Sequence, residues 1–368
     1  LPRCALDSLA RQAETLRGKI EYHLQANHLW ANAKALLFAG AFFSGPAATR
    51  WLKAGQNLLA KEVRKQILED GGHIERSPMY HALILEDVLD LVNLSSIYPG
   101  AVPEIQPVSG PMLNWLEQMT HPDGEISFFN DSACGIAPRP AQIQDYARAL
   151  NIYPLVAPLG ASGYIRLEDG PAVAIFDAAE IGPDYQPGHA HADTLSFELS
   201  LRGRRILVNS GTSTYENNAE RCLQRGTAAH NTLRVDSVDQ SEMWGVFRVA
   251  RRAHCVDIRT DHQRFAEASH TGYHRLSQPV THRRRIELGD EQLTITDKVE
   301  GGGDHLVEIF FHTYPGAVTN IEFDPKMNVS TEDSSYHPQF GVSIPNRRMV
   351  GKWRGRCPTV FTTRVRLA

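Results

Sequence analysis

Two histidines one residue apart, His189 and His191, are the residues whose types and spacing most directly suggest chemistry. They precede an apolar run at every second position from Leu195 to Leu201, and such alternation is typical of a half-buried β-strand. Residues two apart on a strand point to the same face, so we expect both imidazoles to project together from the start of a strand. This spacing predicts a two-histidine site. Histidines hydrogen-bonded within a sheet-edge network are the alternative.

Two later residues fit the same predicted sheet. Asn209 follows the next expected strand, and His230 lies further along the chain. A His-x-His pair, a side-chain oxygen on the neighbouring strand and a distant histidine match the layout of a metal site. The spacing is therefore compatible with a metal site that uses the His-x-His pair, Asn209 and His230, and histidines hydrogen-bonded within a sheet-edge network are the alternative.

Two further candidates lie in the region that reads as helical. Asn27 and His28 fall inside a long apolar-periodic stretch, where asparagine is unfavourable because its side chain competes with the backbone. Residues 72–80 place His, Glu, Arg and Tyr around an expected helix start, and a helix N-terminus favours anions. A surface asparagine, a hydrogen-bonded core histidine and a simple capped helix with Tyr80 packed on a neighbour are the alternatives.

The elements that must position these residues change character along the chain. Helical spacing predicts helices over 5–16, 21–43, 51–68, 77–91, 112–119 and 141–150. Short apolar runs predict strands over 164–167, 172–176, 194–201, 205–208, 231–235, 250–258, 282–288, 293–299, 306–311 and 358–367. We therefore expect an α+β protein, with a helical domain over 1–157 and an antiparallel β-sandwich over 158–368.

Composition excludes several classes of protein. The net charge of −4 gives no global basic field, so we expect no nucleic-acid partner. The basic run at 282–285 is interpreted as a solvated strand edge. No apolar run reaches the roughly 18 residues of a membrane span. The five cysteines form no zinc-type pair. Because the chain begins with Leu1, we interpret it as a processed or trimmed product.

Taken in order, these motifs resemble the heparinase II/III-like polysaccharide lyases. The resemblance is carried by Tyr22-His23-Leu24-Gln25-Ala26-Asn27-His28-Leu29 with Asn32-Ala33-Lys34-Ala35-Leu36, by Asp70-Gly71-Gly72 through Tyr80, by Gly188-His189-Ala190-His191-Ala192-Asp193, by Asn209-Ser210-Gly211-Thr212, and by Arg225-Gly226-Thr227 with His230-Asn231-Thr232. It implies an incomplete (α/α) toroid, with less helical sequence than is usual in the family, followed by an antiparallel β-sandwich.

The resemblance also implies a reaction, β-elimination on a uronic-acid polysaccharide that leaves an unsaturated uronate end. Such a site must neutralise the substrate carboxylate and supply a base and an acid. By resemblance, Asn27 binds the carboxylate with help from His28, and Tyr80 is the base, the acid or both. A free tyrosine has a pKa of about 10, so nearby positive charge must activate it, and Arg76 is the expected neighbour.

The remaining implied roles concern the β domain. His189 neutralises the carboxylate or serves as the base, and Tyr215 and Arg225 contact the substrate. His191 and His230 are the implied ligands of one structural divalent ion, most plausibly zinc, and no organic cofactor is implied. Asn209 stands where the family usually has an aspartate, and a neutral amide is a weaker zinc ligand than a carboxylate.

Two other functions stay open at this point. A glycoside hydrolase would need two carboxylates flanking the bond, for which Glu75 and Asp193 are candidates. A non-catalytic glycan-binding or assembly protein can share the same fold. In each case the expected partner is an acidic polysaccharide or oligosaccharide, and the expected location is the periplasm or the outside of a bacterium. The oligomeric state is left open.

Overall fold

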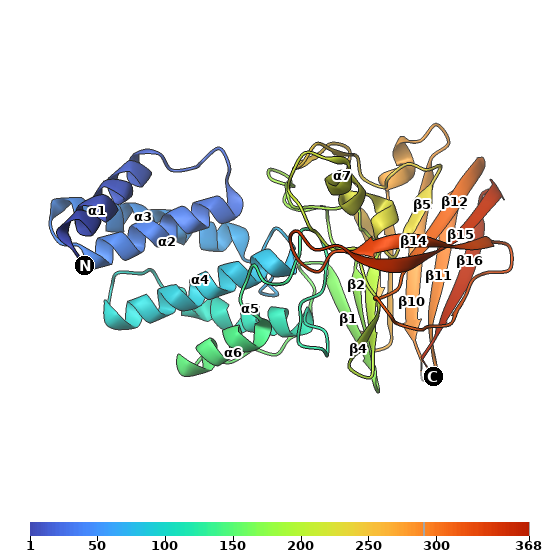
Figure 1. Ribbon diagram of the computed structural model, residues 1–368, viewed down its shortest axis with the longest axis horizontal. Helices are drawn as coiled ribbons and strands as arrows, with labels where there is room; N and C mark the ends of the chain where they lie inside the picture. Colours follow the sequence, from blue (N-terminus) through green and yellow to red (C-terminus); the bar gives the residue numbers. More distant parts are fainter. Residues whose placement is uncertain (290, 368) are drawn as a thin grey trace.

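The computed structural model describes residues 1–289 and 291–367 and shows a helical part followed by a β part (Figure 1). The helices of the first part are α1 (Arg3–Gly18), α2 (Ala26–Phe42), α3 (Pro46–Gln66), α4 (Pro78–Ile97), α5 (Gln106–Gln118) and α6 (Pro140–Ala149). They pack as neighbouring hairpins, with the largest contact between α2 and α3. This confirms the predicted arrangement of an incomplete (α/α) toroid before a β-sandwich.

Helices α2 and α3 pack closely because glycines stand where they meet. A Cβ at Gly40 would lie 2.6 Å from the backbone nitrogen of Leu52, and one at Gly55 would lie 2.9 Å from the side chain of Leu37. A larger residue at either position would force the helices apart. These contacts lie along residues 33–40 of α2 and fix that part of the helix against α3.

Helix α2 begins five residues later than the periodicity predicts. Gln25 and Ala26 have positive φ angles of 62° and 44°, which a helix cannot continue through. Asn27 therefore lies in the first helical turn rather than in the helix interior. The backbone N–H groups of a first turn have no partner within the helix, so Asn27 occupies a position that is open to contacts from outside it.

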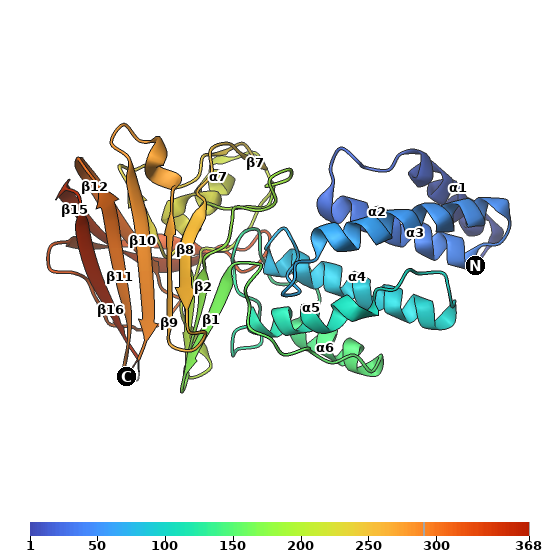
Figure 2. The same ribbon diagram turned by 180° about the vertical axis from the view of Figure 1, so that it is seen from behind.

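Among the described residues, the β part contains four antiparallel sheets, with six, four, four and two strands, and one of the four-stranded sheets lies beside the helices (Figure 2). The sheet beside the helical part has the order β1-β2-β3-β4, and the other two large sheets have the orders β13-β16-β11-β10-β9-β8 and β14-β15-β12-β5. The bounds are β1 Tyr164–Asp169, β2 Ala172–Asp177, β3 Phe197–Leu201, β4 Arg204–Leu207, β5 Leu233–Val235, β6 Met243–Trp244, β7 Arg248–Val249, β8 Cys255–Thr260, β9 Phe265–His270, β10 Val280–Leu288, β11 Gln292–Gly301, β12 Asp304–His312, β13 Ile321–Glu322, β14 Asn328–Tyr336, β15 Ile344–Arg356 and β16 Thr359–Arg366, with helix α7 (Ala219–Arg225) between β4 and β5.

The His-x-His segment does not begin a strand, so that prediction is wrong. Strand β3 starts only at Phe197, and Leu195 has a φ of 62°. The Leu195 N–H donates to the Asp177 carbonyl and the Ser196 N–H donates to the Asp193 carbonyl, which forms a tight turn just before the strand. The two histidines therefore lie on an irregular segment, where alternation does not decide their direction.

The basic run at 282–285 is not a solvated strand edge either. It belongs to β10, which lies between β9 and β11 in its sheet. His282 and Arg284 are fully buried, and both bind the buried carboxylate of Asp297. Two of the run's basic side chains are therefore directed into the interior of the domain, where an internal acid neutralises them.

The helical and β parts are joined by an interface with mixed character. Phe128, Val208 and Tyr336 belong to the hydrophobic core of the helical part, although two of them come from the β part. On the opposite side of the junction, the Gln186 side-chain amide donates to the Leu24 carbonyl at 2.9 Å, and the Lys65 ammonium lies 3.7 Å over the Tyr185 ring. The segment before Asn27 therefore contacts the segment before His189.

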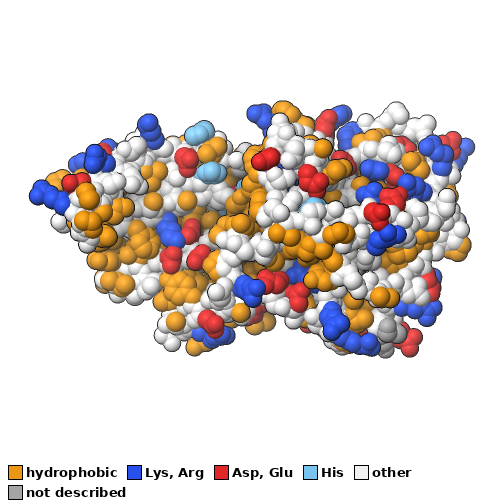
Figure 3. Space-filling model, viewed as in Figure 1, with side chains coloured by type: hydrophobic (Ala, Val, Ile, Leu, Met, Phe, Trp, Pro, Cys, Tyr) orange, Lys and Arg blue, Asp and Glu red, His pale blue; other side chains and the backbone are white. Residues whose placement is uncertain are grey.

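The surface of the two parts differs in the view of Figure 3, where apolar side chains cover a broad area of the helical part. Phe42 and Ile97 are 56% and 62% exposed.

Among residues 1–289 and 291–367, no helix is both long enough and apolar enough to cross a membrane.

Candidate active site

A buried carboxylate, Asp131, is the centre to which both histidines of the His-x-His segment bind. His189 Nδ1 lies 2.9 Å from Asp131 Oδ2, and His191 Nε2 lies 2.8 Å from Asp131 Oδ1. The guanidinium of Arg221 donates to both carboxylate oxygens, with 2.7 Å between Nη2 and Oδ2. The two histidines thus share one acid but take different oxygens of it, which gives them different surroundings.

The charge on Asp131 determines which nitrogens of these rings carry protons. Burial alone would raise the pKa of Asp131, but Arg221 and the two histidines hold it well below its usual value. An ionised carboxylate only accepts hydrogen bonds, so we assign the protons to His189 Nδ1 and His191 Nε2. In a neutral ring, His189 Nε2 and His191 Nδ1 then carry the lone pairs.

Tyr80 lies directly against His189. It stands in the first turn of α4, which Ser77 caps by accepting from the Tyr80 N–H, and Pro78 begins the helix. The Tyr80 and His189 ring centroids are 4.0 Å apart, and the Tyr80 hydroxyl lies 3.3 Å from the Tyr215 hydroxyl. Burial raises the pKa of Tyr80 above 10, although the bond to Tyr215 and the charge of Arg221 act in the opposite direction. Tyr80 therefore holds its proton at neutral pH.

Asn27 reaches this centre through Glu75. The Asn27 backbone N–H donates to Glu75 Oε1 at 3.1 Å, while Glu75 Oε2 lies 3.7 Å from His189 Nε2. Glu75 is only 2% exposed, Oε2 has no hydrogen-bond partner, and burial raises the pKa of this carboxyl. Within the described parts of the chain, the Asn27 side-chain amide makes no hydrogen bond, so it is available to a ligand.

His28 and Tyr215, two further expected substrate contacts, differ in exposure. His28 is exposed, and its Nδ1 lies 3.5 Å from Glu21 Oε2. Tyr215 is half-buried, with its ring 5.9 Å from His189 and 4.8 Å from Phe340. Burial raises the pKa of Tyr215 well above its usual value, so Tyr215 is a neutral partner of Tyr80.

Arg76 was expected to lie one helical turn before Tyr80 and to supply the positive charge that activates it, but the structure places it elsewhere. It precedes α4, has a φ of 56°, and its guanidinium donates to the carbonyls of Ser162 at 3.0 Å and Gly182 at 3.1 Å. Those bonds join the helical part to the β part. The cation that lowers the pKa of Tyr80 is Arg221, whose guanidinium lies 4.9 Å over the Tyr215 ring.

Arg225 cannot contact a substrate in this conformation, because it is fully buried. Its guanidinium donates to the Ala190 carbonyl at 3.0 Å and to the carbonyls of Gly245 and Val246, each at 3.0 Å. Burial lowers the pKa of Arg225 to about 10. The expected substrate contact is thus corrected to a structural role, in which Arg225 fixes the residue between His189 and His191.

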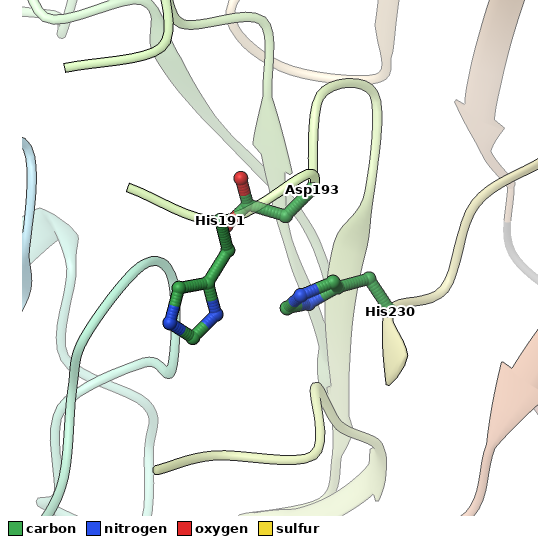
Figure 4. A group of neighbouring side chains, drawn as sticks. All are labelled: His191, Asp193 and His230. Carbon is green, nitrogen blue, oxygen red and sulfur yellow. The ribbon is translucent and has the colours of Figure 1, made fainter. Parts of the chain in front are cut away.

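A second cluster lies on the other side of His191 (Figure 4). The rings of His191 and His230 face each other with centroids 5.3 Å apart, and Asp193 supplies a carboxylate so that one atom of each residue lies within 4.8 Å of the others. Both ring nitrogens of His230 and Nδ1 of His191 are buried without a hydrogen-bond partner. Unpaired buried nitrogens are costly unless a ligand binds them, so these residues fit a metal ion.

Asn209 is buried beside this cluster. Its Oδ1 accepts from the Asn231 N–H at 3.4 Å, its Nδ2 has no partner, and the neighbouring Ser210 N–H donates to the Ala229 carbonyl. Asp193 is an additional acid that the metal prediction did not include. Burial raises the pKa of Asp193 to about 6, while Oδ2 accepts from the Asn130 N–H at 3.0 Å.

The two residues that organise the centre, Asp131 and Arg221, were not predicted. Asp131 lies in the segment between the two domains, where nothing in its neighbours distinguishes it from an ordinary loop acid. Arg221 precedes Arg225 by four residues, so both lie on one face of the same helix. The signal in the sequence was the pair of arginines four residues apart, which follows the His-x-His segment in the same predicted domain.

The chain is similar to known proteins along most of its length. The Heparinase II/III N-terminus family matches residues 5–157, and the Heparinase II/III-like, C-terminal family matches residues 154–363. A heparin-sulfate lyase of Bacteroides stercoris is 22% identical over 372 residues, covering 93% of this chain and 54% of that protein. A heparin-sulfate lyase of Pedobacter heparinus is 26% identical over 267 residues, covering 63% of this chain and 39% of that protein.

Among solved structures, a crystal structure of heparinase III superposes with a TM-score of 0.79 at 17% identity, covering 97% of this chain and 63% of that one. This likeness supports the fold, an (α/α) toroid followed by a β-sandwich. The chain spans about half the length of the first of these curated relatives and less of the second.

Proposed function

The chain belongs to the heparinase II/III-like family, and from this premise we propose that it is the catalytic part of a polysaccharide lyase. The proposed reaction is β-elimination on a uronic-acid-containing polysaccharide, which leaves an unsaturated uronate at the new end. The observation that carries the proposal is the contact of a protonated Tyr80 with His189, whose ring is oriented by Asp131, beside the free amide of Asn27.

The first step is the removal of the proton on the carbon next to the uronate carboxylate. His189 Nε2 carries a lone pair because Asp131 accepts the proton of Nδ1, so His189 is suited to act as the base. Asp131 also stabilises the imidazolium that forms. Tyr80 is less suited to this step, because its raised pKa keeps it protonated.

The second half of the reaction breaks the bond between the ring carbon and the glycosidic oxygen. The electrons left by the abstracted proton form the carbon–carbon double bond, and the leaving oxygen needs a proton. Tyr80 Oη carries one and lies on the ring that stacks on His189. We assign it the role of general acid, after which Tyr215 is the nearest hydroxyl to the phenolate.

The substrate carboxylate must be bound without another negative charge beside it. The Asn27 amide donates a hydrogen bond to it, with exposed His28 as the next side chain along the helix. Glu75 would repel a carboxylate if it were ionised, and burial raises its pKa, which shifts it toward the neutral acid, although His189 and the Asn27 N–H act in the opposite direction. Glu75 holds the Asn27 backbone and leaves Oε2 facing His189.

The proposed site for one structural zinc ion involves His191, His230 and the side-chain oxygen of Asn209 or Asp193. When bound, zinc would accept the lone pairs of the unpaired nitrogens in this cluster and stabilise the segment that carries His189. The residues themselves already hold His191 through Asp131. No organic cofactor enters the proposal.

The first substrate to test is heparan sulfate, because the curated relatives carry the name heparin-sulfate lyase. Alginate-type and bacterial exopolysaccharide chains are the next members of the panel. A polymer of this kind is encountered outside the cytoplasm, so we propose a periplasmic or secreted location.

The test follows ultraviolet absorbance while the protein is incubated with each polysaccharide. A rise in absorbance means that an unsaturated uronate forms and supports the lyase. New reducing ends without absorbance would indicate a hydrolase. Binding of the glycan without either signal would indicate a binding protein on the same fold.

A further inference from the structure

A small hairpin beside the site has features that the reaction does not explain. Strands β6 and β7 pair Met243 with Val249 and Trp244 with Arg248, and the tip at Gly245 has a φ of 59°. The hairpin lies near α7 on the side of the β part that faces the helices (Figure 2). Gly245, at its tip, is exposed.

The exposed tip is nevertheless fixed by buried cations. Arg225 donates to the carbonyls of Gly245 and Val246, and Arg221 Nε donates to the Val246 carbonyl at 3.2 Å. The same Arg221 binds Asp131, and the same Arg225 binds the Ala190 carbonyl. The position of the hairpin is therefore set by the two side chains that also set His189.

The hairpin presents two aromatic rings and a cation to solvent. Phe247 is 42% exposed, with its ring 5.9 Å from His189 and 5.2 Å from Tyr215. Trp244 is 52% exposed, and the exposed Arg248 guanidinium lies 4.9 Å over its ring. Large aromatic side chains that stay half-exposed next to a site are typical of a ligand surface.

We propose that the β6–β7 hairpin is a binding subsite for an acidic sugar unit of the polysaccharide, next to the unit that reacts. Phe247 packs on the apolar face of a pyranose ring beside His189. Arg248, held on Trp244, pairs with a carboxylate or sulfate of that unit or its neighbour through a bidentate contact. This subsite rests on the proposed function, and it explains why a hairpin tip is held by the site's own arginines.

The test compares Phe247→Ala and Arg248→Gln with matched controls at exposed positions elsewhere. Tyr153 is 62% exposed and lies after α6, and Arg354 is exposed on β15, so Tyr153→Ala and Arg354→Gln are the controls. Affinity for heparan sulfate oligosaccharides is measured by calorimetry in the Tyr80→Phe background, and kcat and KM are measured separately in the otherwise native chain.

We expect Phe247→Ala and Arg248→Gln each to weaken binding and raise KM about tenfold, with kcat changed less. Phe247→Tyr should restore binding, and Arg248→Gln should reduce the salt dependence of the affinity. The two controls should remain within about twofold of the parent. Unchanged binding and KM in both hairpin variants would overturn the subsite.

The subsite and the lyase reaction fail in different ways. If binding depends on Phe247 and Arg248 but absorbance does not rise, the subsite is supported and the lyase reaction is contradicted. If absorbance rises but the hairpin variants bind the glycan with unchanged affinity and KM, the lyase reaction is supported and the subsite is contradicted. A parent protein that binds no acidic glycan at all would overturn the subsite as well.

Discussion

Replacing Asp131 with asparagine is the perturbation whose consequences the structure defines best. One carboxylate oxygen accepts from His189 and Arg221, and the other accepts from His191, Arg221 and, more distantly, Thr212. An asparagine must turn its NH2 group toward one of these two sets of donors. Either orientation breaks at least two hydrogen bonds and leaves Arg221 buried without a full counter-charge.

The expected cost follows from the burial of this group. Breaking a buried ion pair by removing one charge typically costs about 3–5 kcal/mol in the free energy of unfolding. In the proposed mechanism the loss of the anion also leaves the His189 tautomer unfixed, and general-base catalysis is worth about 10²–10⁴ in rate. Asp131→Asn should therefore lower both the unfolding midpoint in urea and the rate of absorbance increase, the latter at least a hundredfold.

Asp297→Asn is the matched control. Asp297 is equally buried and accepts from Arg284 and His282 in the same manner, but it lies on β11 in the six-stranded sheet. Both variants are assayed at a temperature where circular dichroism shows that they are folded. The reasoning would be refuted if Asp131→Asn kept the parent rate, or if Asp297→Asn lost as much rate as Asp131→Asn.

Three further predictions concern acidity, the metal cluster and Glu75. Burial lowers the folded-state pKa of His73 to about 3 and that of His81 to about 4, so the unfolded chain binds protons first as the pH falls below 6.5. As the pH falls from 6.5 to 4, each of these two histidines should reduce the free energy of unfolding by up to about 1.4 kcal/mol per pH unit. Urea melts at several pH values measure this slope, and a slope that His81→Gln does not reduce would contradict the prediction. Asn209→Asp should increase the zinc retained after dialysis, measured by elemental analysis, whereas His230→Ala should abolish it; equal zinc content in all three proteins would argue against the site. Glu75→Gln should keep most of the activity, because the neutral acid and the amide are alike in charge and shape. Glu75→Ala should lose at least tenfold in kcat/KM, because Asn27 loses its hydrogen-bond partner and is displaced. Comparable losses in both variants would show that the carboxyl itself is required.

Much of the architecture was predictable because the helices and most core strands have clear periodicity. Helix α6 and strand β10 lie within two residues of the predicted ranges. Strands β14 and β15 were not predicted, because Asn328–Tyr336 and Ile344–Arg356 are rich in polar and charged residues that stand on exposed faces. A strand with few apolar residues gives no alternation to read.

The candidate site was predictable only in part, and the reason lies in long-range contacts. Tyr80 and His189 could be named from their motifs, but they meet only after two domains pack together. Asp131 acquires its role from Arg221, which is 90 residues away in the sequence. Arg225 was expected to contact the substrate on the strength of the family resemblance, and the structure shows that its charge is directed to backbone carbonyls inside the domain.

The central claim is that His189 removes the proton and Tyr80 donates one to the leaving oxygen during β-elimination. It is tested by the absorbance rate of Tyr80→Phe on two substrates, a heparan sulfate oligosaccharide and a uronate whose leaving group at the same carbon is fluoride. Fluoride leaves with little help from an acid. We predict a loss of at least about a hundredfold on the oligosaccharide and less than about tenfold on the fluoride. Equal losses on both would contradict the assignment of Tyr80 as the acid, and no absorbance from the parent protein on either substrate would contradict the lyase itself.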